Sequence, residues 1–373
     1  MPSRVYFADL RSRSGASLLQ KAGRLFDLLD FASLLRPGDK VAVKLHWGEW
    51  GNVAFIPPPF ARCIVEKVLA AGAKPFLTDT NTLYSGGRHN AIDNVLTALK
   101  NGFSIASAGA PIIVADGLTG SDAVEVPAAG KRVASVRVAG AIHHADAILS
   151  LAHFKGHELF GFGGAIKNIA MGCTTPAGKH ILHSDVKPSV DRERCAACGR
   201  CIRACAHGAI RAAEGMKAEI NPEACVGCGE CVAVCPHEAI PINWETAEGP
   251  LFEKSAEYAK AILAGKGGRA AFFNFLMRIS PECDCCGWND APFVADVGIL
   301  ASRDPVAIDQ ASADLVNAGQ VLVASRLEGK AAGGDAIAAA TGVKGWRRML
   351  EYAEEIGMGS RSYELVKTDR EEK

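Results

Sequence analysis

Apolar and polar residues follow one another in a pattern that predicts alternating strands and helices. Short apolar runs at residues 41–45, 74–78, 111–114 and 147–151 favour buried strands. Residues 59–71 and 91–99 favour helices, and residues 124–138 favour an antiparallel ribbon turning at Gly130 and Lys131. Further on, helices are expected at residues 256–263, 305–316 and 345–356, and a strand at residues 294–300. This alternation predicts an α/β fold, with a mainly parallel sheet and flanking helices.

The pattern is interrupted near residue 188 by a segment that is dense in cysteine and short of large apolar residues. Helical periodicity returns only after residue 244. We therefore expect one α/β domain made of residues 1–187 and 245–373, split by a small α+β insertion at residues 188–244.

Composition and charge exclude several classes of protein. Lys plus Arg and Asp plus Glu each total 41, and no basic run is longer than Arg347-Arg348, which argues against a nucleic-acid partner. The apolar stretch at residues 141–151 is short and is interrupted by His143, His144 and Asp146, so no membrane span is expected. The first residues show no apolar signal-peptide core, so we expect a cytoplasmic protein. In that compartment cysteines bind metals more often than they form disulfides.

The insertion contains eight of the 13 cysteines, in the spacing C-x2-C-x2-C-x3-C repeated twice. Three close thiolates of each run suit one [4Fe–4S] cluster, and the fourth ligates the other cluster in two-cluster ferredoxins. The first cluster is then assigned to Cys195, Cys198, Cys201 and Cys235, and the second to Cys205, Cys225, Cys228 and Cys231.

The insertion resembles a bacterial two-cluster ferredoxin domain over about 50 residues. The repeat continues past the cysteines, because residues 205–210 match residues 235–240. Ala206 stands where that family usually has proline, a departure that removes no ligand. The alternative is a pair of zinc sites, but zinc usually takes separated cysteine pairs.

Five cysteines lie outside the insertion. Cys63 fits a buried helical position. Cys283, Cys285 and Cys286 crowd one polar turn, and Cys173 follows a glycine-rich stretch. A third metal or cluster site using Cys173, Cys283 and Cys285 is one hypothesis, and free thiols in a loop are the alternative.

Polar residues follow three of the expected strands. The first group contains Lys44 and His46, the second contains His153, Lys155 and His157, and residues 79–81 form a third. Ligands of open parallel sheets bind beyond the carboxyl ends of the strands, so these groups predict a shared site. There a histidine serves as metal ligand or general base, and a lysine holds an anionic substrate. Alternatively, each is a satisfied polar residue of the fold.

Two further stretches have local roles. Gly163 and Gly164 lie in a glycine-rich loop before a helix-like run, where backbone N–H groups would bind an anion or cofactor, or simply pack tightly. The loop is neither a dinucleotide fingerprint nor a Walker A motif. Asp304 followed by Pro305 predicts a helix start, and Asp309 lies one turn later.

Taken together, the chain resembles the DUF362 family, an iron–sulfur-associated domain of unknown function, over nearly its whole length. The resemblance implies a domain architecture with an inserted ferredoxin segment and cluster binding, but no reaction. The residues that carry it are Lys44, His46, Gly48 and Glu49, residues 155–157, 164–172, 283–285 and 296–299, and Ser302 with residues 304–309.

Three functions remain open. In the first, a redox enzyme, the clusters pass electrons to a substrate or metal at the strand ends. The others are a ferredoxin-type electron carrier and a scaffold for metal-cofactor assembly. A bare carrier does not need about 300 additional residues, which favours the first or third function. We expect a redox partner protein and consider a small-molecule substrate.

Overall fold

An eight-stranded sheet forms the centre of the protein in a computed structural model that describes residues 2–84, 86–183, 187–205, 207–225, 229–241, 248–329 and 334–368. The strand order is β14-β1-β13-β12-β7-β2-β3-β4. Their bounds are β1 Ser3–Asp9, β2 Lys40–Lys44, β3 Lys74–Asp79, β4 Ile112–Val114, β7 Ala147–His153, β12 Ala270–Leu276, β13 Gly298–Ser302 and β14 Tyr363–Lys367.

Parallel pairing dominates this sheet. β13 is antiparallel to both of its neighbours, and every other adjacent pair is parallel. The carboxyl ends of β12, β7, β2 and β3 therefore lie side by side along one edge. The expected α/β fold with a mainly parallel sheet is confirmed. Strands from both sides of residues 188–244 contribute to the sheet.

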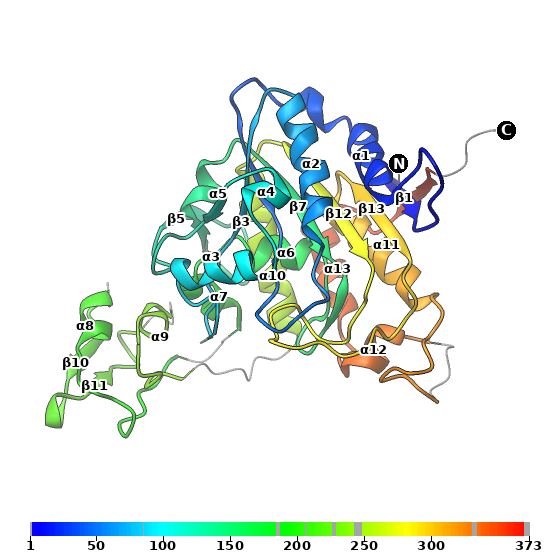
Figure 1. The fold of residues 1–373 in the computed structure, drawn as a ribbon. Helices are drawn as coiled ribbons and strands as arrows, with labels where there is room; N and C mark the ends of the chain where they lie inside the picture. Colours follow the sequence, from blue (N-terminus) through cyan, green and yellow to red (C-terminus); the bar gives the residue numbers. More distant parts are fainter. Residues whose placement is uncertain are drawn as a thin grey trace.

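Helices cover both faces of the sheet (Figure 1). Successive side chains of a strand point to opposite faces, and β2 shows this directly. Val41 and Val43 pack with α1 (Leu18–Leu28) and α2 (Pro58–Ala70), whereas Ala42 belongs to the core on the other face. That second core includes apolar residues of α6 (Ala165–Ala170), α10 (Glu248–Ala264), α11 (Pro305–Asn317) and α13 (Arg347–Glu355).

Smaller elements complete the α/β part. The ribbon expected at residues 124–138 is present as β5 and β6, which pair antiparallel. The bounds are β5 Ala123–Pro127, β6 Ser135–Ala139, β8 Lys155–His157, β9 Gly161–Gly163, α3 Ala91–Lys100, α4 Ile105–Ala108, α5 Gly140–His144, α7 Pro176–His183, α12 Ala336–Thr341 and the 3-10 helix Phe31–Leu34.

Most expected elements are found within a few residues, and the differences have physical reasons. The strand expected at residues 294–300 begins only at Gly298, because Val294 instead forms an isolated bridge with Val321. β12, which is buried along its whole length, was not among the expected elements. The helix start at Asp304 is confirmed, because its carboxylate accepts the N–H groups of Val306 and Ala307.

Within the cysteine-rich segment, residues 188–244, the described residues lie at one side of the α/β part, next to α7 (Figure 1). Its described parts contain α8 (Arg200–Ala204), β10 (Ile210–Ala212), a 3-10 helix (Glu214–Met216), β11 (Ala218–Ile220) and α9 (Glu230–Ala233). The two halves repeat each other. The N–H of Asp191 donates to the Ala239 carbonyl at 2.7 Å, and Asn221 donates to Ala209 at 2.8 Å.

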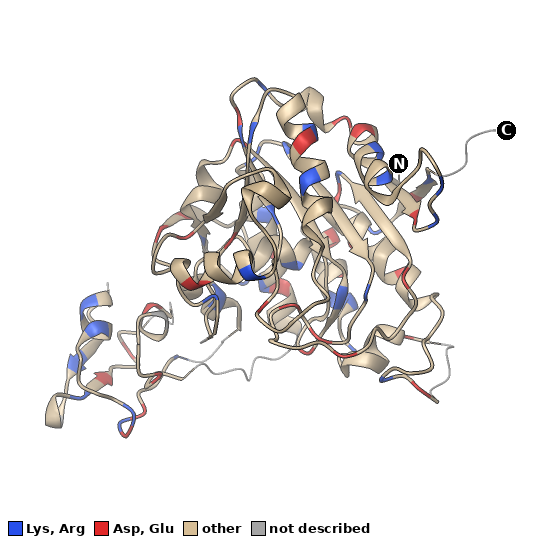
Figure 2. Cartoon of the chain, viewed as in Figure 1, with Lys and Arg blue, Asp and Glu red and all other residues tan. Residues whose placement is uncertain are grey.

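Charged residues of both signs are interspersed over the described parts of the chain (Figure 2). No helix in those parts is both long and apolar enough to cross a bilayer, as the sequence predicts.

Candidate functional site

A cavity of about 470 Å³ opens at the carboxyl edge of the sheet. This volume lies within the range of small-molecule sites. The cavity receives side chains that follow β2, β3 and β7, together with the turn at residues 283–286 that follows β12. Many of the residues singled out in the sequence line it, including Lys44, His46, Lys155, His157, Gly163, Gly164, Cys283 and Cys285.

Buried charges form the floor of the cavity. Lys44 Nζ lies 3.0 Å from the Asp79 carboxylate, and Arg88 lies 3.5 Å from the same carboxylate. Arg88 also pairs with Glu49 at 3.1 Å. Burial alone would raise the pKa of Asp79, but the charges of Lys44 and Arg88 hold it below its usual value.

His46 presents a neutral imidazole to this cavity. Its Nδ1 accepts the N–H of Gly48 at 2.9 Å, so the hydrogen of the ring lies on Nε2. Burial, aided by the charge of Arg88, lowers the pKa of His46 to about 3. The ring is therefore suited to donating a hydrogen bond to a bound molecule.

The structure places His153 outside the lining of the cavity. Its Nδ1 lies 2.8 Å from Asp284, and its Nε2 lies 2.8 Å from the carbonyl oxygen of Met277. Both ring nitrogens are thus engaged by acceptors of the chain itself. Burial would raise the pKa of Asp284, but His153 and Lys155 hold it well below its usual range. His153 anchors the turn that contains the thiols.

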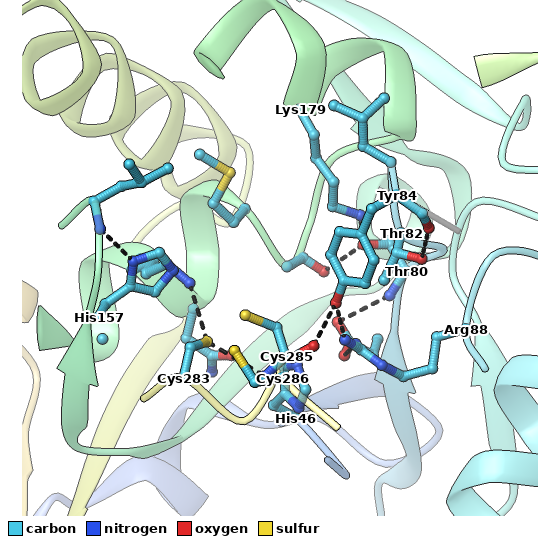
Figure 3. Close-up of a pocket in the computed structure, with 18 of the residues that line it drawn as sticks. His46, Thr80, Thr82, Tyr84, Arg88, His157, Lys179, Cys283, Cys285 and Cys286 are labelled. Atoms are coloured by element: carbon cyan, nitrogen blue, oxygen red, sulfur yellow. Dashed lines mark hydrogen bonds and ion pairs between the residues drawn. The ribbon is translucent and has the colours of Figure 1, made fainter. Parts of the chain in front are cut away.

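This thiol turn, residues 283–286, is closed by a hydrogen bond from the N–H of Cys286 to the carbonyl of Cys283. Cys283 Sγ accepts the N–H of Cys285 at 3.4 Å and lies 3.6 Å from Lys167 Nζ. Figure 3 shows His157 pointing at the same sulfur. A hydrogen bond from Cys285 lowers the pKa of Cys283 well below that of a free thiol, against its burial, and Lys167 and His157 lower it further. The same contact raises the pKa of Cys285.

The thiols are close enough to hold a metal ion. The ligand atoms of His157, Cys283 and Cys285 all lie within 4.8 Å of one another, and so do those of Glu158, Cys285 and Cys286. Cys173 is in neither group. It is buried in the apolar core, and burial raises the pKa of its thiol to about 12.

The glycine-rich loop already has an anionic partner within the chain. The N–H groups of Ala165 and Ile166 donate to the two carboxylate oxygens of Asp309 at 2.7 and 2.9 Å. A Cβ on Gly164 would lie 2.3 Å from Asp309, and one on Gly163 would lie 3.1 Å from Lys155. Glycine is therefore required at residue 164 by close packing against this carboxylate.

The lining residues that sequence reasoning missed include Tyr84, Arg88 and Lys179. Lys179 reaches from α7 to Thr80 Oγ1 at 2.7 Å, and burial lowers its pKa to about 8. Tyr84 donates to the carbonyl of Cys285 at 3.1 Å. They come from a loop and a helix outside the strand ends, so no strand-end pattern marks them. The one local signal is Gly87, which precedes Arg88. A Cβ on Gly87 would lie 2.5 Å from Glu49, so the chain packs closely against Glu49 at this point.

Two smaller hollows lie within the cysteine-rich segment. One is lined by Cys195, Cys198, Cys201 and Cys235. The other is lined by Cys205, Cys225 and Cys231, while Cys228 lies outside the described residues. Backbone N–H groups point at these sulfurs: Ala218 donates to Cys195 at 3.5 Å, and Ala209 donates to Cys205 at 3.3 Å.

The cysteine-rich segment contacts the α/β part next to the cavity. α9 packs against α7, and a Cβ on Gly229 would lie 2.4 Å from His180. Leu83, which lines the cavity, belongs to the apolar cluster of the segment, together with Cys231 and Val232.

These features define an α/β protein with a charged, thiol-bearing cavity at the carboxyl edge of its sheet. The chain belongs to the DUF362 family, described as a domain of unknown function, whose model matches residues 41–314. Among curated proteins, none matches this sequence.

Two solved structures are similar to the chain. One is the lactate racemase apoprotein from Thermoanaerobacterium thermosaccharolyticum, with 13% identity and a TM-score of 0.37, covering 74% of this chain and 51% of that one. The other is a structural-genomics protein from Thermotoga maritima, with 10% identity and a TM-score of 0.38, covering 75% and 54%. The chain spans about half the length of each.

Proposed function

We propose that this protein is an iron–sulfur redox protein in which a ferredoxin-like insertion transfers electrons to a redox site in the cavity. The observation that supports it is that each of the two hollows is lined by one cysteine from the other cysteine run. Cys235 lines the hollow of the first cysteine run, and Cys205 lines that of the second. This exchange of the fourth cysteine is the arrangement of two-cluster ferredoxins.

The two donor sets suit [4Fe–4S] clusters. Residues Cys195, Cys198, Cys201 and Cys235 would hold one cluster, and Cys205, Cys225, Cys228 and Cys231 the other. The clusters would supply one-electron transfer when bound. The N–H groups of Ala218 and Ala209 point at sulfur, and such hydrogen bonds tune cluster potentials. These thiols suit a reducing compartment such as the cytoplasm.

The exposure of the thiols gives the proposed transfer a direction. Cys198 is exposed, so the first cluster would receive electrons from a redox partner protein. α9, in the second run, packs against α7, which contributes Lys179 to the cavity. The second cluster would therefore be the one that serves the cavity.

The cavity favours this proposal over a bare electron carrier, because a carrier has no use for a 470 Å³ charged pocket. A scaffold for metal-cofactor assembly remains the second candidate, and the clustered thiols beside His157 favour it. The two functions differ in one respect: a scaffold releases its metal to another protein, whereas a redox enzyme turns over with its clusters retained.

Metal analysis of anaerobically purified protein tests the proposal. We expect about eight iron and eight sulfide per chain. Cys195→Ser and Cys235→Ser should alter the electron paramagnetic resonance signal of the same cluster, although they lie in different runs. Cys63→Ser, outside every site described, is the matched control. Zinc in place of iron, or different clusters affected by the two variants, would contradict the proposal.

A further inference from the structure

We propose that Cys283 and Cys285 form a redox-active dithiol that reduces a small anionic disulfide bound in the cavity. The two sulfurs belong to one group of atoms within 4.8 Å of one another, and they are joined by a hydrogen bond. Both residues line the cavity. This chemistry gives the proposed electron transfer an acceptor.

The hydrogen bonds of His157 favour a dithiol over a metal site. Its Nδ1 accepts the N–H groups of Leu159 at 3.0 Å and Phe160 at 3.3 Å. Because Nδ1 is unprotonated, the hydrogen of the neutral ring lies on Nε2, which faces Cys283 (Figure 3). A metal-binding histidine needs the opposite tautomer, with the free nitrogen toward the metal and an N–H on the other side. His157 is therefore built to donate to a thiolate.

The groups around Cys283 match those that activate a nucleophilic cysteine. Lys167 Nζ, the N–H of Cys285 and the N–H of His157 all point at its sulfur. Positive charge and donors of this kind stabilise the thiolate, which is the attacking form in disulfide exchange. Cys285, as the neutral partner, is the resolving thiol.

Each step of this exchange balances. The Cys283 thiolate attacks one sulfur of the substrate disulfide, forms a mixed disulfide and releases the first thiolate. Cys285 then attacks Cys283 Sγ, loses its proton and releases the second thiolate, which leaves a Cys283–Cys285 disulfide. Two electrons and one proton restore the thiolate and the thiol. Two [4Fe–4S] clusters, each carrying one electron, hold that number.

A short stretch of chain connects the two centres. Leu83 belongs to the apolar cluster that contains Cys231, and its neighbour Tyr84 donates to the carbonyl of Cys285 at 3.1 Å. The electron supply in this scheme rests on the proposed function. The thiol–disulfide exchange does not.

The charge of the cavity indicates the class of disulfide. Lys167 and Lys179 both line it, and no ion pair with a carboxylate joins either one in the described parts of the chain. Lys179 instead donates to Thr80 and to the carbonyl of Asn81. Two such ammonium groups beside a dithiol favour a substrate that carries carboxylates.

Mass spectrometry of the wild-type holoprotein is the first test. Trypsin cleaves after Arg278 and Arg303, so one peptide contains all three thiols of the turn. The protein is treated anaerobically with 3,3′-dithiodipropionate and then alkylated. We expect one internal disulfide between Cys283 and Cys285, with Cys286 alkylated. Three alkylated cysteines would overturn the proposal, as would a metal ion retained by the turn that blocks all three.

Charge selectivity is the second test. The dianionic probe should oxidise the turn at least about tenfold faster than the dicationic disulfide cystamine. Lys179→Gln should reduce that ratio, and Cys63→Ser should leave it unchanged. Equal rates for the two probes in the wild-type protein would overturn the assignment of an anionic substrate.

Counting electrons separates this proposal from the proposed function. After oxidation by the probe, reductive titration of the wild type should need about two more electrons than Cys283→Ser, which lacks the attacking thiolate and forms neither the mixed nor the internal disulfide. If the clusters are present but the two proteins take up the same number of electrons, the dithiol proposal is refuted and the proposed function is not. A disulfide that forms in a protein without clusters would refute the proposed electron supply and leave the dithiol standing.

Discussion

The α/β part and the cysteine-rich segment are stabilised by very different amounts of apolar packing. The sheet has a large apolar core on each face, built from the strands and at least six helices. The described residues of the segment contribute six buried side chains to one cluster, with partly buried ones packed around them: Cys201, Ile210, Ala218, Cys231, Val232 and Ile240 are the buried six. Two of those six are proposed cluster ligands. A core this small rarely folds without a metal centre or another covalent constraint. The segment should therefore depend on its clusters, whereas the sheet should not.

Removing the clusters should have the largest effect, because it should unfold one region and leave the other folded. Oxidation and chelation of the iron should unfold residues 188–244 while the sheet keeps its structure, because only the segment lacks a core of its own. Hydrogen exchange measured by mass spectrometry checks this region by region. We expect protection to be lost in α8 and α9 and retained in β2, β7 and β12. Retained protection in α8 after complete iron removal would show that the segment folds on its own packing.

In the α/β part, the corresponding weak point is the buried charge network rather than a metal. Lys44 and Asp79 are 1% and 3% exposed. Lys44→Met leaves the Asp79 carboxylate buried with Arg88, at 3.5 Å, as its remaining ion-pair partner among the described residues, and breaking such a pair costs about 3–5 kcal/mol. Urea unfolding followed by far-UV circular dichroism measures the loss. The double variant Lys44→Met with Asp79→Asn should lose less than the sum of the single variants. Additive losses would show that the pair does not interact.

The two regions also differ in how far sequence reasoning reaches. The cluster cysteines follow one another at fixed short spacings, so one local pattern proposes the whole donor set. The cavity is assembled from four strand ends, a loop and α7, and only the strand-end residues can be inferred from the order of elements. Lys44, His46, Lys155 and His157 were found in this way. Lys179 was not, because its position depends on how α7 packs.

His153 shows the limit of the strand-end argument. It lies two residues before Lys155 and four before His157, which in an extended chain would place all three on the same side. β7 ends at His153, however, and a new strand begins at Lys155. The two ring nitrogens of His153 are hydrogen-bonded to the Asp284 carboxylate and to the carbonyl of Met277, and both residues are distant in sequence. Local alternation cannot reveal such partners. His153 therefore holds the thiol turn in place through Asp284 and does not line the cavity.

A pH-dependent contribution to stability is expected from Asp309 in the α/β part. Burial, opposed by hydrogen bonds from Ile166, Asn274 and Ala165, raises the pKa of Asp309 to about 6. Because the folded state holds this proton more tightly than the unfolded state, the contribution of Asp309 is full below about pH 4 and falls by about 2–3 kcal/mol as the pH rises through about 6. Buried His46 contributes with the opposite sign over this range, because its pKa is lowered to about 3. The difference in urea midpoint between the wild type and Asp309→Asn, followed from pH 4 to 7, isolates the contribution of Asp309.

The control for this effect is Asp309→Asn, which removes the titrating group. Its single amide oxygen cannot accept from both Ala165 and Ile166, so the variant should be less stable than the wild type at pH 4. The stability difference between the wild type and this variant should nevertheless shrink between pH 4 and 6, as the contribution of Asp309 is lost. Parallel pH profiles for the two proteins would show that Asp309 does not titrate in this range.

The smallest expected effect concerns the ion pair that joins the two regions. Arg137 of β6 and Glu230 of α9 lie 2.5 Å apart, and their side chains are 30% and 19% exposed. Partly exposed pairs of this kind contribute about 0.5 kcal/mol. A double-mutant cycle of Arg137→Gln and Glu230→Gln, read from hydrogen exchange in α9, should give a coupling of that size. The apolar contact of Leu83 with the segment would then account for more of the docking than this pair does. A coupling above about 2 kcal/mol would reverse that order and make Glu230 the main contact between the cysteine-rich segment and the sheet.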